Sequence, residues 1–181
     1  MAVNRENHPV GETPPPLLRK EGNLATTTRD DGGQFVCGSA DETFELGERI
    51  GRSLNGGEAI LLFGGLGAGK TLLTKGILNA LGFDVDEVTS PSFTLVNLYK
   101  TENFEVFHID LWRLDPSMNP ASAVGLDDIL EDAKAVVIIE WADRLGGFTF
   151  YSDIICVSIE GDGDAERRIK IENRDAKILA Q

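Results

Sequence analysis

The strongest chemical signal in the sequence is a glycine-rich segment at residues 64–71, which reads Gly-Gly-Leu-Gly-Ala-Gly-Lys-Thr. It matches G-x-x-x-x-G-K-[ST] at every fixed position and follows an apolar run. Glycines let successive backbone N–H groups turn inward around an anion, and the dipole of a following helix adds positive potential there. The segment predicts a nucleoside triphosphate site with Lys70 as a catalytic cation, formed by Gly64, Gly65, Leu66, Gly67, Ala68, Gly69, Lys70, Thr71 and Leu72.

Such a loop needs hard oxygen ligands for Mg²⁺, and the hydroxyl of Thr71 is one of them. Two predicted strands end in an acidic residue that could complete the set. The strand that ends at Glu140 is uniformly apolar before its carboxylate, which favours Glu140 as the metal-side ligand. The strand that ends at Asp110 is less apolar, and Asp110 is predicted to position the attacking water or a water bound to Mg²⁺. The alternative for each acid is a solvated strand end.

A second polar segment follows the predicted phosphate-loop helix. Thr89, Ser90 and Ser92 place three hydroxyls around Pro91. Such a segment is either a simple turn or a switch that senses the γ-phosphate through a hydroxyl and the metal. Composition does not favour one over the other.

Four further side chains near these motifs have two interpretations each. His108 has apolar neighbours, which favours a structural imidazole. Trp141, directly after Glu140, either covers the core or belongs to a contact surface. Arg113 and Arg144 either pair with acids or contact phosphate.

Hydrophobic periodicity predicts the elements that position these residues. Ser39 and Glu42 have the spacing of a capping box before a first helix. The resulting alternation is an α/β domain with a mixed sheet and at least one strand–loop–helix unit. We expect helices at residues 41–54, 70–81 and 121–132, and strands at 34–37, 58–63, 88–99, 104–111, 135–141, 153–159 and 167–171.

Composition limits the class of protein. The chain has 181 residues and a formal net charge of -13, which argues against direct binding of nucleic acid. Cys37 and Cys156 are far apart in sequence and form no Cys-x-x-Cys pair, which excludes a disulfide scaffold and a cysteine zinc site. Residues 1–34 hold four of the seven prolines and lack periodicity, so we expect a disordered tail before a domain at 35–181. No apolar stretch is long enough for a membrane span, and we expect a cytoplasmic protein without a membrane partner.

Several segments together resemble one family. The chain is similar to the TsaE (YjeE) family of small bacterial ATPases needed for the threonylcarbamoyladenosine modification of tRNA. The resemblance covers about residues 39–145 and includes the phosphate loop. Its specific part is the order and spacing of Ser-Pro-x-Phe at 90–93, His-x-Asp-Leu-x-Arg at 108–113 and Glu-Trp at 140–141.

The resemblance implies a P-loop NTPase fold, with parallel and antiparallel strands flanked by helices. It implies ATP as substrate, Mg²⁺ held by Thr71 and Glu140, and a role for Asp110 and Trp141 in turnover. It also places Ser39 and Thr43 near the nucleotide base. The implied partners are TsaD and TsaB, with tRNA reached through that complex.

The sequence departs from the family pattern at Gly65, where an acid is usual, and at Leu72, where a second threonine is common. Trp112 stands where the family usually has tyrosine. No arginine finger is identifiable in cis, so we expect slow hydrolysis by the isolated chain and faster hydrolysis in a complex. The rival functions are a small-molecule kinase, for which no lid-like insertion is visible, a GTPase, for which no Asn-Lys-x-Asp motif is present, and a nucleotide-gated adaptor.

Overall fold

The computed structural model describes residues 28–30, 33–115 and 117–174 of the chain. These residues form one eight-stranded sheet in the order β1-β2-β8-β7-β3-β6-β5-β4. The central strands β7, β3, β6 and β5 are mutually parallel, and the remaining pairs are antiparallel. The strands are β1 (Thr28–Asp30), β2 (Gln34–Cys37), β3 (Ala59–Phe63), β4 (Val96–Lys100), β5 (Glu105–Asp110), β6 (Val136–Glu140), β7 (Ile154–Glu160) and β8 (Arg167–Arg174).

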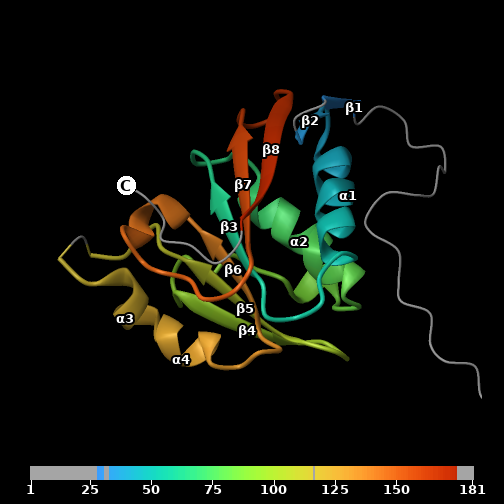
Figure 1. Cartoon of the computed structure of the whole chain (residues 1–181). Helices are drawn as coiled ribbons and strands as arrows, with labels where there is room; N and C mark the ends of the chain where they lie inside the picture. The colour runs from blue at the N-terminus through green and yellow to red at the C-terminus, as the bar shows by residue number, and fades with distance from the viewer. Residues whose placement is uncertain (1–27, 31–32, 116, 175–181) are drawn as a thin grey trace, which may run out of the picture.

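Helices cover both faces of the sheet (Figure 1). The two longest, α1 (Ala40–Gly51) and α2 (Lys70–Ala80), pack side by side on one face. The short helices α3 (Pro120–Val124) and α4 (Leu126–Leu130) lie on the other face. The 3-10 turn η1 (Val85–Glu87) lies between α2 and β4, and η2 (Ala142–Leu145) connects β6 to β7. None of the described helices has the length and apolar character needed to cross a bilayer.

The alternation of side chains along the central strands divides the interior into two cores. On β3, Ile60 and Leu62 join the core beneath α1 and α2, whereas Ala59 and Leu61 join the core beneath α3 and α4. Every residue of β6 is buried. This burial on both faces explains why β3 and β6 are continuous apolar runs in the sequence.

The two cysteines are both free, as their spacing predicts, and both are buried. Cys37 lies at the end of β2 and Cys156 lies in β7. Burial raises the pKa of both thiols. These thiols are therefore core residues with little thiolate character at neutral pH.

Three expectations about the elements are wrong in detail. The strand expected at 88–99 is a strand only from Val96, because the hydroxyl of Tyr99 binds the Thr89 carbonyl and turns the segment before it into a loop. The helix expected at 121–132 is broken by Gly125, whose φ of +64° ends α3 and begins α4. The helix expected at 41–54 ends at Gly51.

The boundary expected for the disordered tail also needs correction. β1 (Thr28–Asp30) pairs with β2, and Gln34 already belongs to β2, so ordered structure begins before residue 35. A strand of three residues is too short to show periodicity in the sequence. This strand is defined by its pairing with β2. Residues 1–27 of the expected tail and residues 175–181 of the expected domain lie outside the described residues.

The contact between α1 and α2 is tightest at two glycines. A Cβ on Gly76 of α2 would collide with the backbone carbonyl of Phe44, and one on Gly47 of α1 with that of Leu73. Neither glycine has a positive φ, so close approach of the helices is the reason for both. The close approach positions α2, whose first turn carries Lys70 and Thr71.

We expect Gly76→Ala to destabilise the protein by about 1–3 kcal/mol, because the added methyl group forces the helices apart. The change in the free energy of unfolding is measured by urea denaturation followed by circular dichroism. Gly147→Ala is the matched control, since a Cβ there meets nothing within 4 Å. Equal stability of the two variants would contradict this account of the helix contact.

Candidate nucleotide site

The phosphate loop connects the end of β3 to the start of α2, as predicted. Gly64 and Gly69 have φ of +148° and +104°, in the region that favours glycine. A Cβ on Gly64 would lie 2.6 Å from the carbonyl oxygen of Ile159 in β7. The backbone can follow this path only because both positions lack a side chain. The loop thereby brings the first turn of α2 to the carboxyl end of the parallel strands, where ligands bind in open α/β sheets.

Lys70 closes the loop from inside. Its Nζ donates hydrogen bonds to the carbonyls of Gly64, at 2.8 Å, and Gly65, at 2.7 Å. The same ammonium lies 3.9 Å from the ring centroid of Trp141, in a cation–π contact. Burial lowers the pKa of Lys70, while the nearby carboxylates, Glu140 first among them, act in the opposite direction. The Gly64 and Gly65 carbonyls and the Trp141 ring therefore position the Lys70 side chain at the loop.

The two predicted acids meet at the ends of adjacent parallel strands. Asp110 ends β5 and Glu140 ends β6, and the register pairs these two residues. Each is only 3% exposed. Both lie on the α2 face of the sheet, because they are in phase with Val106 and Ile138 of that core. The sheet order thus brings together two carboxylates that are 30 residues apart in the sequence.

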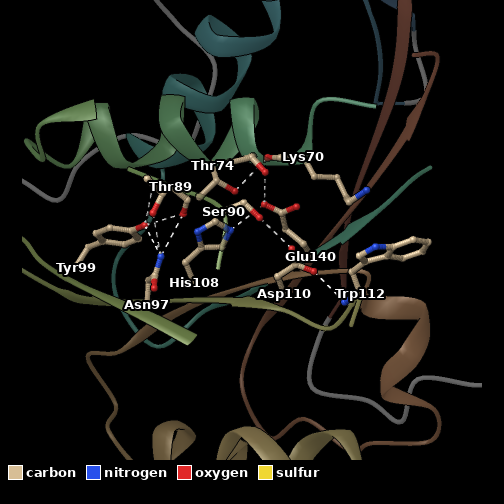
Figure 2. Close-up of polar contacts among 11 residues, drawn as sticks. Lys70, Thr74, Thr89, Ser90, Asn97, Tyr99, His108, Asp110, Trp112 and Glu140 are labelled. Atoms are coloured by element: carbon tan, nitrogen blue, oxygen red, sulfur yellow. Dashed lines mark hydrogen bonds and ion pairs between the residues drawn. The ribbon is translucent and has the colours of Figure 1, made fainter. Parts of the chain in front are cut away.

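Glu140 is hydrogen-bonded to Thr71, the other residue predicted to bind Mg²⁺. The hydroxyl of Thr71 donates to Glu140 Oε1 at 2.8 Å, and His108 Nε2 lies 2.8 Å from the same oxygen (Figure 2). His108 is fully buried, and its Nδ1 has no hydrogen-bond partner among the described residues. The interpretation of His108 as only a structural imidazole is therefore incomplete. Its bond to Glu140 fixes the orientation of that carboxylate.

Asp110 joins two loops beneath the site. Its Oδ1 accepts a hydrogen bond from the Trp112 backbone N–H at 2.9 Å, and its Oδ2 accepts one from the Ser90 hydroxyl at 3.0 Å (Figure 2). The Thr89 carbonyl is held from the other side by the side chains of Asn97 and Tyr99. The polar segment at 89–92 is therefore a loop attached directly to a predicted catalytic acid.

Trp141 is the centre of a stack of side chains. It has a left-handed backbone with φ of +59°. Its ring centroid lies 4.2 Å from that of Trp112, and the Arg144 guanidinium lies 5.2 Å from the Trp112 ring centroid. Arg144 also donates to the carbonyls of Leu111 and Leu114. The Trp141 ring is thus held against Lys70, and Arg144 is committed to supporting the stack.

These residues surround one cavity of about 360 Å³. The cavity gathers predicted residues from the phosphate loop, both acids, Ser90 and Ser92 of the polar loop, and Trp141. Larger hollows occur at the opposite end of the strands, around Glu58 and Asp153, away from these groups. The cavity is lined by Leu66, Gly67, Gly69, Lys70, Thr71, Leu72, Ser90, Ser92, Asp110, Trp112, Arg113, Glu140 and Trp141.

The two residues expected near the nucleotide base, Ser39 and Thr43, lie at the start of α1. The Ser39 hydroxyl caps α1 by accepting from the Glu42 N–H at 3.1 Å, as the capping-box spacing predicts. Thr43 is fully buried, with its methyl group behind Gly69. Neither residue lines the cavity. Their described roles are to begin α1 and to support the back of the loop, and their contact with a base stays a prediction.

Arg167 supports the loop from β8, although it belongs to no motif in the sequence. It is 6% exposed, and its Nε donates to the Ala68 carbonyl at 3.1 Å. A second nitrogen donates to the carbonyl of Gly163 in the β7–β8 connection. A separation of 99 residues from Ala68 leaves no local pattern by which this contact could be found.

We expect Arg167→Ala to weaken nucleotide binding about tenfold, because the Ala68–Gly69 peptide loses a charged donor that fixes its orientation. Calorimetric titration with ADP measures the change. Arg168→Ala is the control, since that neighbour alternates to the other face and its side chain is 74% exposed. Equal affinities for the two variants would show that the loop needs no support from β8.

The oxygen donors of the site fit Mg²⁺. No cluster of three or more acidic, histidine or cysteine side chains that could hold a metal occurs in the described part of the chain. Mg²⁺ in nucleotide sites needs no such cluster, since one or two protein oxygens and the phosphates hold it. The Thr71 hydroxyl and Glu140 Oε1, 2.8 Å apart, supply two such oxygens.

The sheet order, the glycine-rich loop and the acids at the strand ends define a P-loop α/β fold. The chain is similar to the crystal structure of YdiB from Bacillus subtilis, with 26% identity and a TM-score of 0.56 over 77% of this chain and 83% of that one. The family model described as threonylcarbamoyl adenosine biosynthesis protein TsaE matches residues 37–169. This chain belongs to the TsaE family.

Its relatives include proteins named tRNA threonylcarbamoyladenosine biosynthesis protein TsaE from several bacteria. The Nostoc protein is 32% identical over 77% of this chain and 87% of its own length. The Treponema pallidum protein is 33% identical over 72% of this chain and 95% of its own. The Aquifex aeolicus protein is 36% identical over 61% and 77%, respectively.

Proposed function

We propose that this protein hydrolyses ATP in an Mg²⁺-dependent reaction, and that hydrolysis supports repeated turnover of a TsaD–TsaB complex that makes threonylcarbamoyladenosine in tRNA. The observation that carries the proposal is the convergence of Lys70, the Thr71–Glu140 pair and Asp110 on one cavity. Membership of the TsaE family supports the pathway.

In this proposal the phosphate loop holds the triphosphate and Asp110 orients the water. Lys70 exchanges its two carbonyl partners for the β- and γ-phosphate oxygens. Each Asp110 oxygen already accepts one hydrogen bond, and a carboxylate has lone pairs left for another. Thr71 and Glu140 would hold Mg²⁺, which would supply charge neutralisation to the bound triphosphate.

The reaction is a displacement at the γ-phosphorus. The water oxygen forms a bond to the γ-phosphorus, the bond from that atom to the bridging oxygen breaks, and ADP and inorganic phosphate leave with one proton released to solvent. Most of the catalysis is positioning and charge stabilisation, which fits a site of fixed polar groups.

Exposed apolar side chains at the cavity mouth support a protein partner. Leu66, which is 75% exposed, and Trp112 line the cavity, and Phe93, which is 82% exposed, contacts the lining residue Arg113. Exposed apolar groups that gather around a functional cavity are typical of interaction sites. A net charge of -13 makes direct binding of tRNA unfavourable, so tRNA is expected to bind the complex rather than this chain.

The proposal is tested by reconstituting tRNA threonylcarbamoylation with TsaD and TsaB, with and without this chain, over many turnovers. We expect product formation to continue only when the chain and ATP are present, and ATP hydrolysis to be slow for the chain alone and faster in the complex. Phosphate transfer to a metabolite rather than water would favour a kinase. Bound ATP that persists in the assembled complex would favour a nucleotide-gated adaptor.

A further inference from the structure

The cavity has few positive charges for the ligand proposed. Of the charged residues that line it, Lys70 and Arg113 are basic, whereas Asp110 and Glu140 are acidic. Negative charge on the transferring phosphoryl group is usually met by a second cation besides the loop lysine, often an arginine. The sequence alone identified no such arginine.

Among the described residues, three arginines near the site differ in their contacts. Arg167 is committed to the Ala68 and Gly163 carbonyls. Arg144 is committed to the Leu111 and Leu114 carbonyls and to the Trp112 ring. Arg113 is exposed and lines the cavity. Its guanidinium lies 4.3 Å from the Phe93 ring centroid, in a cation–π contact.

The attachment of Arg113 links it to the catalytic acid. Asp110 binds the backbone N–H of Trp112, the residue directly before Arg113. The other oxygen of Asp110 binds Ser90, in the loop that carries Phe93. The two loops are therefore joined twice, once at Asp110 and once through the Arg113–Phe93 contact. An exposed cation–π contact is weaker than a charge-assisted hydrogen bond to phosphate. The Arg113 guanidinium can therefore exchange the Phe93 ring for a phosphate oxygen.

We propose that Arg113 is the second phosphate-binding cation and stabilises the γ-phosphoryl group during its transfer to water. This inference rests on the proposed ATP hydrolysis. Arg113 leaves the ring of Phe93 for the γ-phosphate oxygens, donates hydrogen bonds to them and keeps its proton throughout. The reaction is otherwise the displacement described above, with ADP and phosphate as products.

The test compares Arg113→Ala and Arg113→Lys with wild type, using the full-length chain alone and with TsaD and TsaB. Three quantities are measured: Mg²⁺–ADP affinity, affinity for Mg²⁺–ADP with aluminium fluoride as a mimic of the transferring phosphoryl group, and single-turnover ATP hydrolysis. Arg52→Ala is the matched control, because its side chain is 59% exposed and its ion pair with Glu48 lies on α1. Thermal unfolding establishes that each variant is folded.

We expect Arg113→Ala to bind ADP within about twofold of wild type, to lose at least about tenfold in affinity for the fluoride complex, and to hydrolyse ATP about 100-fold more slowly. Arg113→Lys should recover only part of the rate, because a point charge cannot replace the planar fork. Wild-type affinity and rate in Arg113→Ala would overturn the inference and leave ATP hydrolysis standing. A wild-type chain that does not hydrolyse ATP, alone or in the complex, would remove both.

Discussion

Replacement of Lys70 by alanine should reduce ATP hydrolysis by at least about 100-fold, the largest effect expected for any single side chain here. Its ammonium lies among the Gly64 and Gly65 carbonyls and the Trp141 ring, at the position where it can transfer to bound phosphates. No other lysine of the described residues lines the cavity. The loss should appear both as weaker ATP binding and as a lower rate at saturation, since Lys70 contacts the phosphates before and during the reaction.

Assays of phosphate release and of ATP binding test this prediction. Lys134→Ala removes the same charge just before β6, at the end of the strand opposite Glu140, where the side chain is exposed. The control should hydrolyse ATP like the wild type. A Lys70→Ala protein that turned over ATP at the wild-type rate would show that the cavity around the phosphate loop is not the hydrolytic site.

Glu140→Gln should have the second-largest effect. The variant keeps the shape of the side chain but removes the charge that the Thr71–Glu140 pair offers to Mg²⁺. We expect hydrolysis to fall at least about 100-fold and the Mg²⁺-dependent gain in nucleotide affinity to be lost, while affinity measured in EDTA stays within about twofold of wild type. Titrations with and without Mg²⁺ separate the loss of metal binding from a loss of nucleotide binding.

Glu160→Gln is a matched control for this experiment, because Glu160 also ends a central strand but is exposed. Its nucleotide affinity should respond to Mg²⁺ as in the wild type. If Glu140→Gln kept the full response to Mg²⁺, the assignment of Glu140 as a metal ligand would be incorrect. Thr71 would then be left as a metal ligand without its proposed acidic partner.

Local patterns were sufficient for most of the central elements. β3 and β6 are buried on both faces, so their sequences are continuous apolar runs, and the ends expected for them differ from the observed ones by at most one residue. Prediction failed where the pattern was ambiguous. The segment at 88–95 is rich in residues common in strands, but bonds to Tyr99 and Asn97 turn it into a loop. Propensity is a weak guide where a tertiary contact competes with it.

The site, too, has parts that follow from local patterns and parts that depend on tertiary contacts. The phosphate loop could be found because its chemistry depends on glycines, a lysine and a threonine at fixed spacing along one continuous segment. The contact between Glu140 and His108 joins residues 32 positions apart, and the contact of Arg167 with the loop joins residues 99 positions apart. Residues whose partners lie on other strands carry no periodic signal of their role.

The sequence by itself determined that a buried strand passes through a phosphate-binding turn into a helix, and that acids end two further strands. Only the tertiary structure decided that those acids stand side by side, because the order of strands in a sheet places residues that are distant in the chain at one edge. Among the described residues, it also decided that Arg144 and Arg167 are committed to backbone carbonyls and that Arg113 is left at the cavity. That distinction depends on hydrogen-bond partners in other elements, which no spacing along the chain encodes.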